Sequence, residues 1–219
     1  MDHSQPEARQ AEDQRRQRAV AENLKAASPV VQELRAAGFP VEHIADLFNR
    51  KMDYRRAITI LLRWLPLVDN KAVKQDIVRA LSVKWARPSA AKTLVDEFLA
   101  ADSKSDGSLK WAIGNALSVV ADDTVFDDLV AIACDQAQGR AREMVVVALG
   151  NMRDPRAAGV LMGLLDDQEV AGHAIIALGK LRPSGARQRL ERFLGDPRAW
   201  VRTEARRAVA KIDRTAQDQ

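Results

Sequence analysis

Apolar residues recur along this chain with helical spacing, and one helix ending returns five times. The endings are Ala80-Leu81, Ala116-Leu117, Ala148-Leu149, Ala177-Leu178 and Ala208-Val209, separated by 36, 32, 29 and 31 residues. A unit of about 30 residues is too short to bury its own apolar face, so it must stack on its neighbours. The most apolar stretches keep helical rather than two-residue periodicity, so no strand is expected. The pattern predicts an all-α solenoid.

Proline, glycine and aspartate positions predict where the units begin and end. Residues 1–28 are polar and rich in Arg and Gln, which predicts a flexible or weakly helical lead. Pro29 is expected to begin a first capping helix that Gly38 ends. The repeat domain is then predicted over 29–219, with a cap at 29–50 and repeats at about 53–86, 88–121, 123–153, 155–182 and 184–213.

Composition adds a compartment to this picture. Hydrophobic residues make up 47% of the chain and aromatics 5%. The longest uncharged runs are far shorter than the ~18 to 20 residues that a membrane helix needs, and the first ten residues have no apolar signal core. The single Cys134 fits a reducing compartment. We therefore expect a cytoplasmic protein with no membrane partner.

Charge is distributed unevenly. Residues 93–135 hold nine acids and two bases, whereas residues 180–214 hold eleven bases and four acids. A basic end can bind phosphate backbones, but a charged last unit also keeps the exposed end of a repeat array soluble. Both interpretations stay open, with the solubility cap preferred.

The second helices follow a template of an apolar residue, a base and a later Ala-Leu. The opening pairs are Val73-Lys74, Leu109-Lys110, Ala141-Arg142, Val170-Ala171 and Val201-Arg202, and acids precede four of them at Asp69, Asp106, Asp167 and Asp196. Over residues 53–213 this pattern resembles HEAT repeats, especially the short HEAT-like repeats of the phycobilin-lyase type. The resemblance implies a right-handed α-solenoid of about five helical hairpins. It also implies that the turn acids and second-helix bases form a structural ladder: Asp69, Lys74, Asp106, Lys110, Asp196 and Arg202.

No reaction centre is predicted. His3, His43 and His173 are far apart in sequence and none has a second His or Cys at helical spacing, so no zinc site is expected. Asp122-Asp123 and Asp127-Asp128 have a spacing that could bind a hard cation. Acids at the start of a helix also interact favourably with the positive end of the helix dipole, and we prefer this structural interpretation. We expect no catalytic residue, no metal and no cofactor.

The inner ridge of the second helices is the most informative surface. On a helical wheel Trp111 and Asn115 lie opposite the core, and HEAT-like arrays use that ridge as their concave face. Val146, Val147, Ile175 and Ile176 are apolar on positions where a solvated helix would be polar. Either tight curvature packs these helices together, or a groove accepts an apolar partner segment. The two interpretations carry equal weight.

These observations favour a non-enzymatic module that binds another protein or peptide segment through its concave face. Trp111 is predicted to anchor the partner, although a wedge between helices is the equally weighted alternative. The predicted partner-binding residues are Trp111, Asn115, Glu143, Val147, His173 and Ile176, with Arg79 and Arg207 at the ends of the groove. The second candidate is a nucleic-acid binder using the basic C-terminal repeat. A HEAT-like alkylpurine DNA glycosylase comes third, because aromatic pocket walls are scarce. A chromophore lyase is also disfavoured, because the repeat resemblance carries no pigment-handling residue.

Overall fold

The computed structural model describes residues 4–102 and 105–217, which are helices joined by short turns. Within these residues the fold is all-α and contains no strand, consistent with an α-solenoid of HEAT-like repeats. The predicted fold class is therefore confirmed. The chain divides into two compact units, Met1–Leu81 and Ser82–Gln219.

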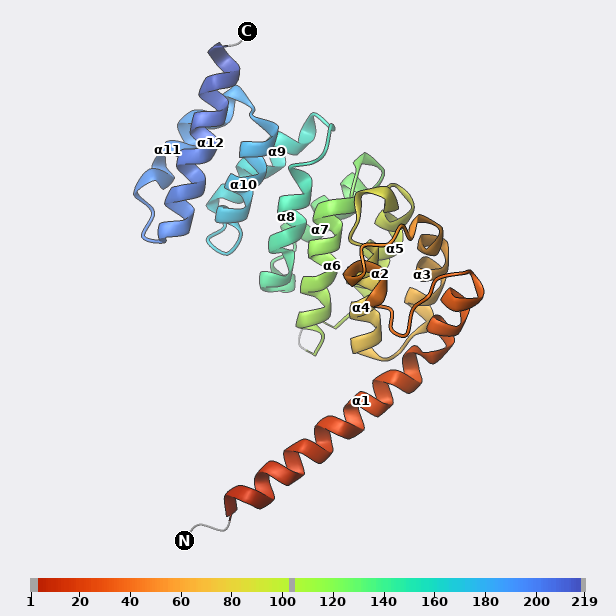
Figure 1. Cartoon of the computed structure of the whole chain (residues 1–219). Helices are drawn as coiled ribbons and strands as arrows, with labels where there is room; N and C mark the ends of the chain where they lie inside the picture. The colour runs from red at the N-terminus through yellow and green to blue at the C-terminus, as the bar shows by residue number, and fades with distance from the viewer. Residues whose placement is uncertain (1–3, 103–104, 218–219) are drawn as a thin grey trace. The chain divides into compact units, whose positions relative to one another are not determined.

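The first unit is built on a long N-terminal helix. Its elements are α1 (Ser4–Ala36), α2 (Asp46–Asn49), the 3-10 helix η1 (Arg55–Ala57), α3 (Ile58–Trp64), η2 (Leu65–Leu67) and α4 (Lys71–Leu81) (Figure 1). Val30 and Leu34 at the end of α1 are fully buried, and Glu33 accepts a hydrogen bond from the Trp64 indole at 2.8 Å. These contacts fix the C-terminal part of α1 against the rest of the unit.

Helix α1 runs through the residue at which we expected a helix to begin. Pro29 lies inside α1, so no helix boundary falls between residues 28 and 29. Proline removes one backbone hydrogen bond from a helix interior, but the buried residues that follow it, Val30 and Leu34, hold the helix in place on its C-terminal side. The expectation of a separate capping helix starting at Pro29 was wrong for this reason.

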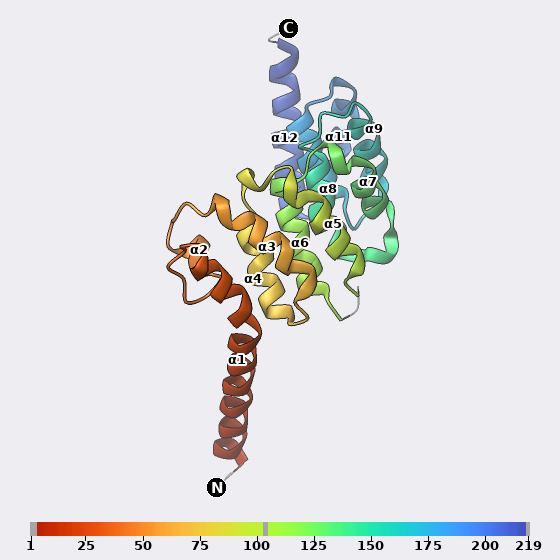
Figure 2. The ribbon, with the colours of Figure 1, turned by 90° about the vertical axis from the view of Figure 1, so that its right-hand side faces the viewer.

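The second unit consists of helical pairs. The first helices are α5 (Ser89–Ala100), α7 (Phe126–Cys134), α9 (Arg156–Gly163) and α11 (Arg187–Glu191), and the second helices are α6 (Gly107–Val120), α8 (Glu143–Leu149), α10 (Ala171–Leu181) and α12 (Ala199–Gln217). Short 3-10 helices lie between them: η3 (Lys84–Ala86), η4 (Asp123–Val125), η5 (Gln136–Arg142), η6 (Leu164–Asp166), η7 (Ser184–Ala186) and η8 (Arg192–Gly195). The second helices follow one another side by side (Figures 1 and 2).

Small residues let these second helices approach closely. A Cβ atom on Gly150, at the end of α8, would lie 2.7 Å from the Ala177 Cα atom of α10. A Cβ on Gly179 of α10 would lie 3.0 Å from the Ala208 Cβ of α12. Real Cβ atoms do not come as close as the first value, so Gly150 is required by the contact. Neighbouring repeats are therefore packed closely along their second helices, with glycine of one helix against alanine of the next.

Candidate functional site

An open groove of about 440 Å³ lies where α6 meets the turn before α8. It is lined by Gly107, Trp111, Ala137, Gln138, Gly139, Arg140, Ala141 and Glu143. The Trp111 side chain is 57% exposed, so the indole forms a wall of the groove rather than part of the core. Gly139 has a φ of 53°, which breaks η5 and which residues other than glycine rarely adopt. The groove thus combines an exposed aromatic wall with a turn that glycine makes.

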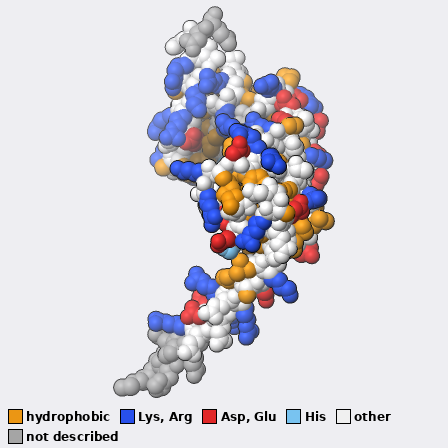
Figure 3. Space-filling model, turned by 45° about the vertical axis from the view of Figure 1, so that its right-hand side comes forward, with side chains coloured by type: hydrophobic (Ala, Val, Ile, Leu, Met, Phe, Trp, Pro, Cys, Tyr) orange, Lys and Arg blue, Asp and Glu red, His pale blue; other side chains and the backbone are white. Residues whose placement is uncertain are grey.

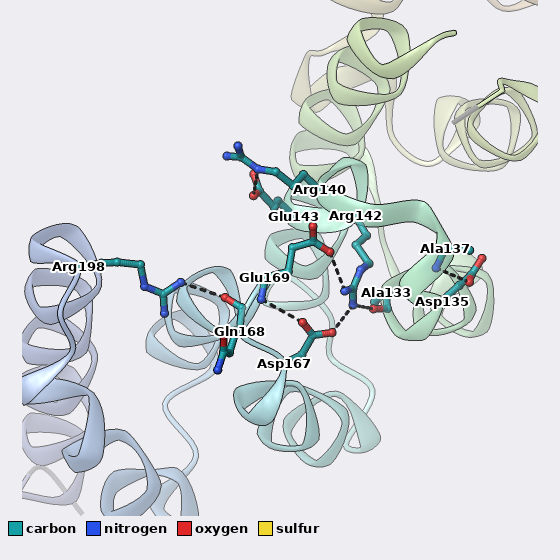
Figure 4. A network of polar contacts seen from close by, with 10 residues as sticks. All are labelled: Ala133, Asp135, Ala137, Arg140, Arg142, Glu143, Asp167, Gln168, Glu169 and Arg198. Carbon is teal, nitrogen blue, oxygen red and sulfur yellow. Dashed lines mark hydrogen bonds and ion pairs between the residues drawn. The ribbon is translucent and has the colours of Figure 1, made fainter. Parts of the chain in front are cut away.

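Two arginines of this turn have opposite roles (Figure 4). Arg140 is exposed and its Nε atom donates to the Glu143 carboxylate at 2.9 Å, which orients Glu143 at the groove. The Arg142 side chain is only 2% exposed and donates to the Ala133 carbonyl at 3.1 Å, to Asp167 at 2.6 Å and to Glu169 at 3.0 Å. Arg140 therefore belongs to the surface, and Arg142 joins two successive repeats.

The ionisation of the Arg142 contacts follows from their burial. Burial works to lower the pKa of Arg142, but hydrogen bonds to Asp167 and Glu169 outweigh it and raise the pKa. Burial likewise works to raise the pKa of Asp167, and the hydrogen bond from Arg142 reverses the direction. Both groups are therefore held in their charged forms.

His173 extends the groove toward the last repeat. Its Nε2 atom lies 3.8 Å from the Glu143 carboxylate, and its ring centroid lies 5.4 Å from that of Trp200 with the planes tilted by 53°. Burial lowers the pKa of His173, while the charge of Glu143 opposes that shift and the charges of Arg140 and Arg198 add to it. The Nδ1 atom is buried and has no hydrogen-bond partner in the part of the chain that the structure describes. His173 is therefore favoured in its neutral form.

Gly172 makes room for Trp200. A Cβ atom on Gly172 would lie 2.1 Å from the Trp200 Cη2 atom, so the indole rests directly on the backbone of α10. Trp200 still exposes 44% of its surface, and the Arg198 guanidinium stands 5.9 Å from its ring. We call the surface formed by Trp111, Arg140, Glu143, His173 and Trp200 the two-indole surface.

The structure connects three of the predicted partner-binding residues. Trp111 and Glu143 line the same groove, and His173 adjoins Glu143. Asn115 is half-buried one turn beyond Trp111, and its amide donates to the Trp111 carbonyl at 2.9 Å. Ile176 is half-buried one turn beyond Gly172. These residues come from three successive second helices.

The remaining predicted residues are placed differently. Val147 is only 6% exposed, so it offers no open surface and we remove it from the candidate site. Helix α8 is covered on two sides, because Gly114 of α6 lies against Met144 and Gly150 lies against Ala177 of α10. Close helix packing, one of the two interpretations left open above, thus accounts for the apolar residues of α8.

The two arginines predicted at the ends of the groove each pair with an acid of their own helix. Arg207 is exposed on α12 and forms an ion pair with Glu204 at 2.6 Å. Arg79 belongs to α4 of the first unit, where its guanidinium lies 3.9 Å from Asp76. Their assignment to the groove stays a prediction.

Trp200 and Arg140 were missed by the sequence analysis. Trp200 stands one residue before the repeated template, so aligning the repeats did not place it on the inner ridge. The signal was Gly172, a glycine at the position that Trp111 and Glu143 occupy in other repeats. A glycine there indicates that another side chain covers the helix.

The candidate cation site has structural partners instead. Asp122 caps η4 by accepting from the Thr124 amide at 3.0 Å, and Asp123 accepts from the Arg153 amide at 2.8 Å. Asp127 pairs with Arg156, and Asp128 pairs with Lys92. No group of three or more His, Cys, Asp or Glu residues that is suited to a metal ion occurs among residues 4–102 and 105–217. His3 lies outside the described residues.

Helix length and polarity bear on the membrane prediction. Across the described segments, none of the helices combines the length and the apolar character needed to cross a bilayer.

One segment of the chain is similar to a known family. Residues 141–167, from Ala141 of the groove to Asp167 of the Arg142 contact, match the family model of the PBS lyase HEAT-like repeat. No curated protein matches the chain significantly. Together with the all-helical architecture, the match supports the assignment of this chain to a HEAT-like repeat family.

Proposed function

We propose that this protein is a non-enzymatic interaction module that binds a partner protein or peptide segment on the two-indole surface. The observation that supports it most is the exposure of Trp111 beside a groove of about 440 Å³. An exposed indole buries a large area on binding and donates one hydrogen bond, which is the profile of an interface hot spot.

Rigid support strengthens this proposal. Glu143 is oriented by Arg140, and Trp200 rests on Gly172. A surface whose side chains are already held loses less entropy when a partner binds. The polar groups between the two indoles would then fix the direction of the bound segment.

We assign no lyase or glycosylase activity to the chain. The family match covers one repeat, which positions helices, and a shared repeat does not determine a reaction. The proposal accordingly gives the named side chains binding roles only.

The test uses three exposed tryptophans of the second unit as tagged single variants. Trp111→Ala and Trp200→Ala should lose a partner that the wild type retains in affinity capture from its host, measured by quantitative mass spectrometry. Trp85→Ala is the matched control, because Trp85 is 44% exposed and lies in η3, outside the two-indole surface. It should retain the partner.

Stability separates binding from packing. Trp111→Ala should change the free energy of unfolding by less than about 1 kcal/mol, as expected for an exposed site. A loss of about 3 kcal/mol or more would show that Trp111 is a core residue. Identical sets of captured proteins for the wild type and all three variants would contradict the proposed site.

A further inference from the structure

A row of cationic and amide side chains occupies one repeat position just after α8, near the end of α10 and within α12. Asn151, Lys180 and Lys211 each stand three residues after the Ala of the repeated helix ending, at Ala148, Ala177 and Ala208. They therefore occupy one position in three successive repeats. The close contacts Gly150–Ala177 and Gly179–Ala208 bring these positions of α8, α10 and α12 together.

Hydrogen bonds connect the row to the end of α6. The Lys180 ammonium donates to the Asn151 side chain at 3.2 Å, and the Asn151 amide donates to the Ser118 carbonyl at 2.7 Å. Arg87 donates to the next carbonyl, that of Val119, with its Nε atom at 2.8 Å. Arg87, Asn151, Lys180 and Lys211 thus form a continuous strip, which we call the C-terminal row.

The cations of the C-terminal row are not neutralised by acids. Arg87, Lys180 and Lys211 are exposed, and none forms an ion pair in the described part of the chain. Partial desolvation of the Lys180 ammonium lowers its pKa, and the charges of Lys211 and Arg87 lower it further. Like charges have therefore been gathered within electrostatic reach of one another.

Four other bases of the last repeat differ in this respect. Arg187 pairs with Glu191 and Asp213, Arg189 and Arg192 approach Asp166, and Arg198 pairs with Asp196. The solubility-cap interpretation of the basic end does not explain the C-terminal row, because a cap needs polarity but gains nothing from gathering unpaired cations. Figure 3 shows Lys and Arg side chains near the C-terminal end of the chain.

We propose that the C-terminal row binds the phosphate backbone of a nucleic acid. A nucleic-acid strand carries one negative charge about every 3.4 Å, so it offers a phosphate to each helix end in turn. Binding a single phosphate group would require donors that converge on one point, whereas these cations are distributed over successive helices. The backbone is contacted without regard to base sequence, since lysine and arginine at phosphates carry no sequence information.

The test measures fluorescence anisotropy of a labelled mixed-sequence 20-nucleotide single strand, titrated with the full chain at several salt concentrations. The double variant Lys180→Gln/Lys211→Gln should bind about tenfold more weakly at low salt. It should also lower the slope of log K against log salt by about 1.4, or about 0.7 for each lost phosphate contact.

The matched control removes the same amount of charge from the C-terminal part of the chain. Arg189→Gln/Arg192→Gln deletes two cations that already face Asp166, and it should keep affinity within about twofold and leave the salt slope unchanged. Lys180→Arg/Lys211→Arg should keep the binding. Circular dichroism and thermal unfolding of each variant show that affinity is compared between folded proteins.

Three results would overturn the proposal. The first is a wild type that does not bind the strand at low salt. The second is an equal loss of affinity in Lys180→Gln/Lys211→Gln and Arg189→Gln/Arg192→Gln. The third is wild-type affinity and salt slope in Lys180→Gln/Lys211→Gln. A fourth arm uses an unlabelled polyglutamate peptide in place of the strand. Row-dependent binding of that peptide without binding of the strand would assign the row to an acidic protein surface and reject the nucleic acid.

Discussion

In the unit Ser82–Gln219, positively charged side chains have opposite roles near the start of the second helices and farther along them. Near the N-terminal ends, Lys110 and Arg142 are 2% and 1% exposed, and each bonds to the following repeat: Lys110 to Gln138 at 2.7 Å and Arg142 to Asp167 at 2.6 Å. Farther along the second helices, Lys180 and Lys211 are exposed and unpaired with acids in the described residues. A buried cation must be compensated, whereas an exposed one stays available to a ligand.

The comparison also shows what holds the repeats together at each end. Near the N-terminal ends the repeats are joined by buried polar contacts, and farther along the second helices they are joined by glycine packed on alanine. Arg202, at the same template position, donates to its own turn, at the Asp196 and Pro197 carbonyls. The template position therefore connects two repeats at Arg142 and stabilises a turn within one repeat at Arg202.

The largest effect should come from breaking the buried connection. Arg142→Ala leaves Asp167 in a half-buried site without its cation and opens a cavity, so we expect the free energy of unfolding to fall by about 3 to 5 kcal/mol. Chemical denaturation followed by circular dichroism measures this. Arg140→Ala is the control two residues away, because the Arg140 side chain is 81% exposed, and it should cost less than about 1 kcal/mol. Equal losses would remove the distinction between buried and surface charge.

Much of this fold was predictable because the repeated helix endings are core positions. The all-α class follows from Ala-Leu endings that are now buried, including Ala116, Leu117, Ala177 and Leu178. The ladder was predictable in kind but not in detail. The base of one repeat reaches the turn of the next, where Lys110 donates to Gln138 and Arg142 donates to Asp167.

The candidate site was less predictable than the fold, because exposure depends on which helices touch. Trp111 and Val147 both stand on the inner ridge of the wheel, yet one is exposed and the other is buried. Gly114 and Gly150, which bring the helices on each side against α8, decide this difference. Trp200 was not predicted as a site residue because it lies outside the repeated template, and its place on this surface depends on its contact with Gly172.

A smaller effect should come from the C-terminal ends. Gly150→Ala places a methyl group 2.7 Å from the Ala177 backbone, so α8 and α10 must separate. We expect a loss of about 1 to 3 kcal/mol in the free energy of unfolding, as for other overpacked sites. Gly159→Ala on α9 is the matched control, since a Cβ there meets nothing within 4 Å. It should be neutral or stabilising by about 0.5 to 1 kcal/mol, and a similar loss in both variants would show that close packing does not join the repeats.

The smallest effect should appear as a pH dependence at His173, beside the groove. The pKa of His173 in the folded protein is lowered, first by burial and then by Arg140 and Arg198, with Glu143 opposing. Below its ordinary value of 6.5 the unfolded chain therefore binds a proton that the folded protein does not. Stability should fall as pH decreases from 6.5 to the folded pKa, and the loss should then stay constant.

His173→Gln removes this titration, so its free energy of unfolding should decrease less than that of the wild type between pH 7 and pH 5. Denaturation curves at half-unit intervals give the two slopes, and a constant offset from lost packing on Trp200 does not affect them. The same slope of the free energy of unfolding against pH in His173→Gln and the wild type would contradict this prediction. It would mean that the charge of Glu143 compensates the burial of the ring, so that α10 holds a protonated His173 near its N-terminal end as Arg142 is held before α8.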